Sequence, residues 1–193
     1  MLENKTNQGL SSDTFGARWQ GKAGPYVSYN LEYAQQKDAG ENLTDYSAEY
    51  NLAEINGSIP VGASKINLGV GYELLGSDDG VTAFATSLAT LHAFQGWADK
   101  FLATPATGIE DTYFSVGTSL QSFNLNLVYH TYAADEGSGD YGSEFGFSAD
   151  TKVGPVGLTL KYADYSADAE IPTPGVVFTR DTKKLWLMAA VTY

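Results

Sequence analysis

Histidine and carboxylate side chains are the groups in this sequence that could carry out acid–base or metal chemistry. The chain has two histidines and no cysteine in 193 residues. His92 lies close in sequence to Asp99 and Lys100, and His130 stands in an aromatic stretch. Two histidines without a cysteine provide none of the ligand spacings that protein metal sites use. We therefore expect no metal and no cofactor.

Hydrolytic chemistry would require a nucleophile beside His130, and no serine in the sequence stands out for that role. The simpler interpretation of His130 is a polar side chain that lines a pore, and we expect that the protein is not an enzyme. A hydrolase built on an outer-membrane barrel remains one alternative.

Acidic residues are concentrated in the stretches "GSDDG" and "ADEGSGDYGSE". Their carboxylates could hold Ca²⁺, but neither stretch follows the EF-hand pattern, and solvated loop charge is the simpler interpretation. The formal net charge of −12 predicts that nucleic acid is not a partner, because phosphate recognition requires a basic face. The acidic residues of these stretches are Asp78, Asp79, Asp135, Glu136, Asp140 and Glu144.

The elements that position these groups are predicted to be β-strands. In "FNLNLVYHTY" (123–132), apolar and mostly polar residues alternate with a period of two, which is typical of a strand with two different faces. Nine segments show this pattern. They are Thr14–Gln20, Tyr26–Gln35, Tyr46–Ile55, Lys65–Leu75, Asp111–Leu120, Phe123–Tyr132, Glu144–Thr151, Val156–Tyr165 and Lys183–Tyr193.

These segments are longer than the strands of about five to six residues found in most globular proteins, and they match the roughly 9–11 residues that cross a bilayer. Tyrosine and tryptophan recur near the ends of the apolar stripes, as in the aromatic girdles of outer-membrane barrels. The sequence therefore predicts an all-β, antiparallel transmembrane barrel with its apolar side toward lipid. A soluble lipocalin-like binding module, apolar inside, is the first alternative to this interpretation. The aromatic residues are Trp19, Tyr26, Tyr33, Tyr46, Tyr72, Tyr129, Tyr162, Tyr165 and Tyr193.

If the apolar sides face lipid, the opposite sides line a water-filled interior. These sides are rich in amides and glycines and carry charges of both signs. The predicted pore-lining residues are Arg18, Glu49, Asn67, Glu73, Asn124, Asn126, His130, Lys161 and Lys184.

Short and long connections alternate along the chain, as periplasmic turns and extracellular loops do in membrane barrels. Complete single-chain barrels have an even number of strands, whereas this pattern gives nine. We therefore expect residues 1–193 to be one barrel domain or the C-terminal part of a larger one. The remaining strands would come from the parent chain or from another copy; a nine-stranded closure with one parallel seam is an alternative.

The longest connection, residues 76–110, departs from the strand pattern. Its middle has helical spacing and predicts a short helix around Ser87–Leu102. The connection is interpreted either as a constriction folded into the lumen or as an apolar loop packed over the barrel mouth. The predicted constriction residues are His92, Trp97, Asp99 and Lys100.

The stretch "LATLHAFQGWADKFLATPATGIEDTYFSVG" resembles the alginate-export porins of Gram-negative outer membranes, as do "VYHTYAADEGSGDYGSEFGFSAD", "LTLKYADYSAD" and "DTKKLWLMAAVTY". The resemblance covers about residues 64–193. It implies a barrel of about sixteen to eighteen strands and a terminal aromatic residue, here Tyr193. It also implies contact with membrane lipid and lipopolysaccharide and passive passage of a polar solute, such as an anionic oligo- or polysaccharide like alginate.

Overall fold

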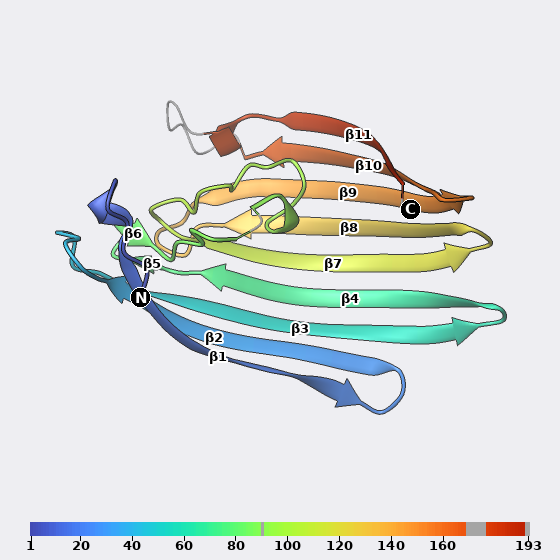
Figure 1. Ribbon diagram of the computed structural model, residues 1–193, viewed down its shortest axis with the longest axis horizontal. Coiled ribbons are helices and arrows are strands. Elements are labelled where there is room, and N and C mark those ends of the chain that lie inside the picture. The colour runs from blue at the N-terminus through green and yellow to red at the C-terminus, as the bar shows by residue number, and fades with distance from the viewer. Residues whose placement is uncertain (90, 169–176, 192–193) are drawn as a thin grey trace.

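The chain forms one open, antiparallel sheet of nine long strands (Figure 1). The computed structural model describes residues 1–89, 91–168 and 177–191. Each long strand pairs with the next long strand along the chain, and β1 and β11 are the two edges. The strands are β1 (Ser12–Ala23), β2 (Val27–Asp38), β3 (Ser47–Val61), β4 (Ser64–Leu75), β7 (Ile109–Leu120), β8 (Phe123–Ala133), β9 (Asp140–Val153), β10 (Val156–Ala167) and β11 (Thr182–Val191).

The prediction of an all-β antiparallel sheet from nine segments is confirmed. The strands extend further than the alternation alone indicated, because the backbone pairing continues into the turns. Strand β3, for example, passes through Pro60 and pairs with β4 as far as Val61 and Ser64. Gly62 and Gly154 begin two of the tight turns with φ of 61° and 59°, a region that glycine enters without steric cost.

The connections differ in length at the two ends of the sheet, as expected from the sequence (Figure 1). Residues 24–26, 62–63, 121–122 and 154–155 form short turns at one end. Residues 39–46, 76–108 and 134–139 lie at the other end, as do residues 168 and 177–181, the described part of the connection between β10 and β11. The connection 76–108 contains the two short strands β5 (Ser77–Asp78) and β6 (Thr82–Ala83), and its remainder lies against one face of the sheet.

We call the face against which residues 76–108 lie the inner face and the opposite one the outer face. Strand pairing places residues of alternate parity on each face. Large apolar side chains on the outer face are exposed across the sheet; Leu187, for example, is 76% exposed. They include Phe15, Trp19, Leu31, Ile55, Val70, Phe114, Leu127, Leu158 and Leu187.

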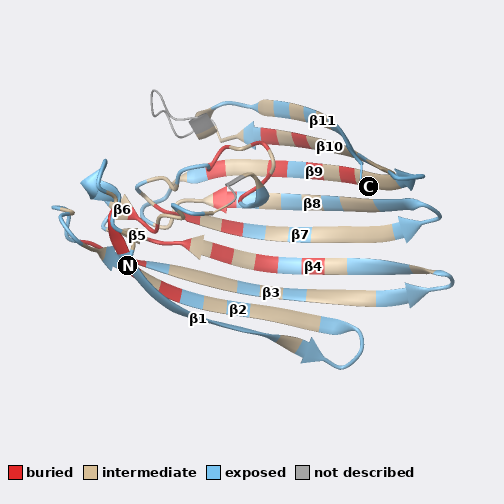
Figure 2. Cartoon of the chain, viewed as in Figure 1, coloured by how far each residue is buried: buried red, intermediate tan, exposed pale blue. Residues whose placement is uncertain are grey.

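The hydrophobic core lies on the inner face, at the end of the sheet that bears the long connections (Figure 2). Phe101 from residues 76–108 is at its centre, with its ring centroid 4.8 Å from that of Tyr132 and 5.7 Å from that of Tyr141. Leu75 and Ile109, where the connection leaves and re-enters the sheet, are also buried. The connection therefore acts as the second layer of the fold over this part of the sheet.

The predicted helix around Ser87–Leu102 is wrong. Among the described residues of that range, only Leu91–Ala93 form a single 3₁₀ turn. Gln95, Gly96 and Asp99 adopt φ of 50°, 80° and 58°, and left-handed residues at these positions cannot continue a right-handed helix. No helix in the described ranges is long and apolar enough to cross a membrane.

Two aromatic residues predicted for a girdle lie elsewhere. Tyr46 and Tyr165 are 6% and 0% exposed and belong to the core on the inner face. Both stand at strand ends, as predicted, but residues 76–108 supply apolar partners on the inner side. Tyr193, the predicted terminal aromatic, lies outside the described residues.

Candidate functional site

Residues 76–108 are attached to the inner face by polar side chains from several strands. On β2, the Gln36 amide donates to the Ala85 carbonyl at 3.0 Å and accepts from the Ala85 N–H at 2.8 Å. On β4, the Glu73 carboxylate accepts from Gln95 Nε2 at 2.7 Å. Two backbone groups and one side-chain group of the connection are thus satisfied by strand residues, and these hydrogen bonds hold the connection along a defined path.

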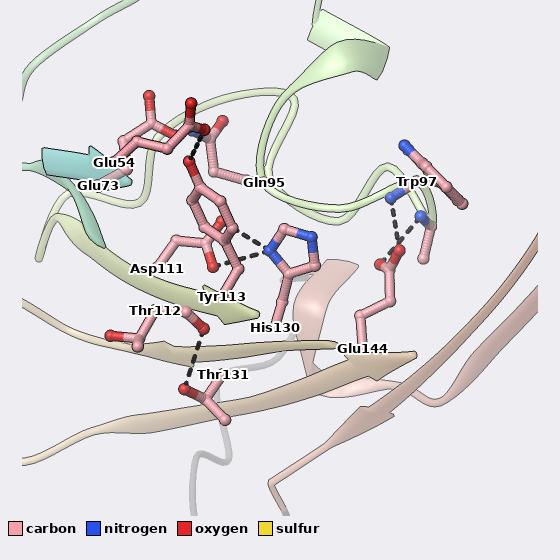
Figure 3. Close-up of polar contacts among 11 residues, drawn as sticks. Glu54, Glu73, Gln95, Trp97, Asp111, Thr112, Tyr113, His130, Thr131 and Glu144 are labelled. Carbon is pink, nitrogen blue, oxygen red and sulfur yellow. Dashed lines mark hydrogen bonds and ion pairs between the residues drawn. The ribbon is translucent and has the colours of Figure 1, made fainter. Parts of the chain in front are cut away.

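Glu144 on β9 provides the third attachment (Figure 3). Its carboxylate is 1% exposed and accepts the backbone N–H groups of Trp97 and Ala98, the latter at 3.0 Å. Gly96 permits this approach, because a Cβ there would lie 2.5 Å from Glu144 Oε2. The prediction that Glu144 carries solvated loop charge is therefore wrong: a buried carboxylate is stable here because two backbone donors satisfy it.

Asp99 connects residues 76–108 to the edge strand β11. Its Oδ1 lies 2.6 Å from His92 Nδ1, and its Oδ2 accepts from Lys184 Nζ at 2.6 Å. Burial alone would raise the pKa of Asp99, but the hydrogen bonds and charge of Lys184 and His92 outweigh burial and leave the pKa below its usual value. Next to it, burial lowers the pKa of the Lys100 ammonium group, which lies 5.1 Å from the centroid of the Tyr165 ring.

A cleft of about 350 Å³ lies between the connection and the inner face of the sheet. Its lining combines carboxylates with aromatic and amide side chains. The lining residues that carry its chemistry are Arg18, Glu54, Glu73, Trp97, Tyr113 and His130.

Tyr113 crosses the sheet to reach Glu54 (Figure 3). It comes from β7, and Glu54 comes from β3, with β4 between them. The ring occupies the space above Gly71 on β4, where an added Cβ would lie 2.2 Å from the ring Cζ. Glycine at this position lets the Tyr113 hydroxyl donate to Glu54 Oε2 at 2.7 Å.

His130 is held in one orientation by Asp111. Its Nδ1 lies 2.9 Å and 3.0 Å from the two Asp111 carboxylate oxygens, and its ring stacks on Tyr132 with centroids 5.6 Å apart. Asp111 is only 1% exposed. A histidine–carboxylate pair can orient an imidazole for base catalysis, but this ring contacts the aromatic side chains of Tyr113 and Tyr132 and the Asp111 carboxylate rather than a serine or cysteine nucleophile. Within the described residues, no group of three or more histidine and acidic side chains is arranged to hold a metal ion.

The strand pairing shows where each predicted pore-lining residue lies. Four of them line the cleft: Arg18, Glu73, Asn126 and His130. Four more share the inner face outside that cleft lining: Asn67, Asn124, Lys161 and Lys184.

The prediction for Glu49 is wrong, because Glu49 lies on the outer face. It pairs with Gln35, and its carboxylate accepts from the Tyr33 hydroxyl at 3.4 Å. Strand β3 also has apolar residues on its inner side, Tyr50 and Leu52, and Tyr50 packs against Phe84 of the connection with centroids 5.4 Å apart. With apolar residues on both sides, the alternation in this strand does not indicate which side faces inward.

All four predicted constriction residues belong to the connection that lies on the inner face. Asp99 binds His92 and Lys184, Lys161 lies 4.6 Å from the Trp97 ring centroid, and Lys100 contacts the Tyr165 ring. Sequence reasoning missed Gln36, Glu54, Asp111 and Tyr113. Asp111 and Tyr113 share the parity of Ser115 and Gly117 within a predicted strand and alternate with the apolar Phe114 and Val116, a signal that could have placed both on the inner face.

Together these residues form a polar cleft that residues 76–108 cover and that carboxylates line on the sheet. Such a cleft is suited to contact a polar solute through hydrogen bonds and charge.

Comparison with protein-family models, with curated proteins and with solved structures finds no match to this chain. The resemblance to alginate-export porins therefore stays a prediction.

Proposed function

We propose that the nine-stranded sheet is part of the wall of a transmembrane β-barrel in a Gram-negative outer membrane. The barrel would be a channel for passive passage of a polar solute, and residues 76–108 would form its constriction. The observation that carries this proposal is the exposed apolar outer face, which spans the sheet while the core lies on the other face.

The outer face has the composition and size of a lipid-facing surface. Its apolar side chains extend from Phe15 on β1 to Leu187 on β11, which are 85% and 76% exposed. Contiguous apolar surface of this extent is rare on soluble monomers, because it would be in contact with water. The strands have 10 to 15 residues, which is enough at about 3.3 Å per residue to cross an apolar band of about 25 Å while tilted.

The open edges support a larger assembly. In the nine-stranded sheet each strand runs opposite to its neighbour, so the first and last strands run in the same direction. The two edge strands β1 and β11 are therefore parallel to each other. An unpaired strand edge is costly in a bilayer, where no water satisfies the backbone. We therefore propose that further strands, from the parent chain or from another copy, close the barrel between β1 and β11.

The arrangement of the leucines argues against a lipocalin-like module with a dry apolar interior. Such a module would gather Leu125, Leu158 and Leu187 inside, whereas these residues lie on the outer face and the latter two are 40% and 76% exposed. Within the described residues, the inner face is polar over most of its length and is covered only near the long connections.

Fluorescence quenching by brominated lipid tests the proposal directly. The chain has three tryptophans: Trp19 on the outer face, Trp97 in residues 76–108, and Trp186 on the inner face of β11. Single-tryptophan variants, with the other two replaced by phenylalanine, are folded into vesicles of brominated and ordinary phosphatidylcholine. We expect strong quenching of Trp19 and little quenching of Trp97. Equal quenching of the two, or quenching of Trp97 alone, contradicts a lipid-facing outer face.

A further inference from the structure

We propose that the cleft between residues 76–108 and the sheet binds solutes that carry an ammonium or guanidinium group, so that the constriction favours organic cations over anions. The inference rests on the proposed function for the route that brings the solute to the cleft. Three observations support it. They are the pairing of charged groups on the inner face, the aromatic lining of the cleft, and the contacts of the chain's own lysine and arginine side chains with carboxylates and aromatic rings.

Two carboxylates of the cleft, those of Glu54 and Glu73, accept from neutral donors, whereas that of Asp111 is paired with His130. Glu54 accepts from the Tyr113 hydroxyl and from Asn56 Nδ2, each at 2.7 Å. Glu73 accepts from the Tyr50 hydroxyl and from Gln95 Nε2, also each at 2.7 Å. Neutral donors stabilise a carboxylate without cancelling its charge, so these groups contribute a negative potential to the cleft.

The cations of the inner face are already occupied near the cleft. Arg18 Nε donates to Glu32 Oε2 at 2.6 Å. Lys184 donates to Asp99, and the ammonium group of Lys161 lies over the Trp97 ring. Each of these positive charges has an anionic or aromatic partner, which leaves little positive potential to attract an anion.

The same contacts show that the wall binds cationic groups. The ammonium group of Lys161 lies 4.6 Å from the centroid of the Trp97 ring, a favourable cation–π distance. A guanidinium group, that of Arg18, is held by a carboxylate at the margin of the cleft. Tyr50, Phe94 and Tyr113 line the cleft beside Glu54 and Glu73 and offer further aromatic surface.

Glu54 is the most informative residue to change. It lines the cleft, is only partly buried and has no hydrogen bond to the described residues of 76–108, so Glu54→Gln should leave the connection attached. The glutamine side-chain oxygen can still accept from Tyr113, and its NH₂ group replaces the oxygen that accepts from Asn56, whose amide can rotate to present its own oxygen. The substitution thus removes the charge and keeps the shape of the side chain. Glu49→Gln is the matched control, because Glu49 lies on the same strand but on the outer face.

The test is isothermal titration calorimetry. The protein is folded in a zwitterionic detergent and titrated with spermidine and, separately, with citrate. We expect spermidine to bind, citrate not to bind, and Glu54→Gln to weaken the affinity for spermidine about three- to tenfold, the effect of losing one charge-assisted contact. Glu49→Gln should bind spermidine as the unmodified protein does. The circular dichroism spectrum and thermal transition of both variants show that each is folded.

Tighter binding of citrate than of spermidine, or equal affinities of Glu54→Gln and the unmodified protein for spermidine, overturns the inference. This result is separate from the fate of the proposed function. The titration reports on the cleft in detergent whether or not the barrel conducts, and quenching of Trp19 by brominated lipid reports on the outer face alone.

Discussion

The inner and outer faces of the sheet both carry large apolar side chains but differ in what covers them. On the inner face, residues 76–108 cover the core, and Phe101 is 7% exposed. On the outer face nothing in the described residues covers Phe15 or Leu187, which are 85% and 76% exposed. Burial stabilises a protein by about 25 cal/mol per Å² of apolar surface removed from water. The inner face gains this energy within the chain, whereas the outer face requires lipid or another apolar partner to gain it.

Phe101→Ala should have the largest effect, because it empties the centre of the inner core. The ring contacts Tyr132, Tyr141 and Phe178, and truncating a buried phenylalanine typically costs about 3–5 kcal/mol. Guanidinium unfolding in detergent measures the loss. Leu88→Ala is the control, since Leu88 lies in the same connection and is 86% exposed. Equal effects of the two substitutions would mean that the core does not form as described.

Leu127→Lys tests the outer face near the middle of β8. In vesicles we expect a loss of about 2–4 kcal/mol in the free energy of unfolding, because a lysine at the bilayer midplane is poorly solvated. Asn126→Lys, one residue along the strand and on the inner face, should cost much less. If the two variants unfold at the same denaturant concentration, the faces do not differ in solvent.

Glu144→Gln tests the attachment of residues 76–108. A glutamine can accept only one of the two backbone N–H groups and points a donor at the other, so we expect a loss of about 1–3 kcal/mol. Hydrogen exchange at the Trp97 and Ala98 amides should become faster. Exchange in Glu49→Gln, on the outer face, should remain as in the unmodified protein; unchanged exchange in Glu144→Gln would contradict the attachment.

Asp99→Asn should have the smallest effect and a pH dependence of defined sign. Because the pKa of Asp99 is lowered in the folded protein, its ion pairs stabilise the fold above the unfolded pKa of 3.8 and are lost as the pH falls through the folded value. The unmodified protein should exceed the variant in stability by about 0.5–1 kcal/mol at neutral pH. The difference should shrink in unfolding experiments as the pH falls below the usual pKa of Asp, because the carboxylate of the folded protein is then progressively protonated. A difference that grows on acidification would contradict the ion pairs with Lys184 and His92.

The strands were predictable because their signal is local. Residues Phe123–Tyr132 alternate with a period of two, and the structure places Leu125 and Leu127 on the outer face and Asn126 and His130 on the inner face. The assignment of alternate residues to the inner or the outer face became ambiguous only where both sides of a strand are apolar, as in β3. There, Tyr50 packs against Phe84, which lies 34 residues further along the chain and left no local signal in the strand.

The amino-acid sequence by itself determined the nine strands, their order and most of the division between faces, because side chains of an extended backbone alternate whatever lies beside them. Only the tertiary structure decided the path of residues 76–108 and the burial of Glu144. It also decided the contact of Tyr113 with Glu54 across Gly71. The physical reason is that these features depend on partners from distant strands: a glutamine on β2, a glutamate on β9 and a glycine on β4 come together only when the sheet has formed.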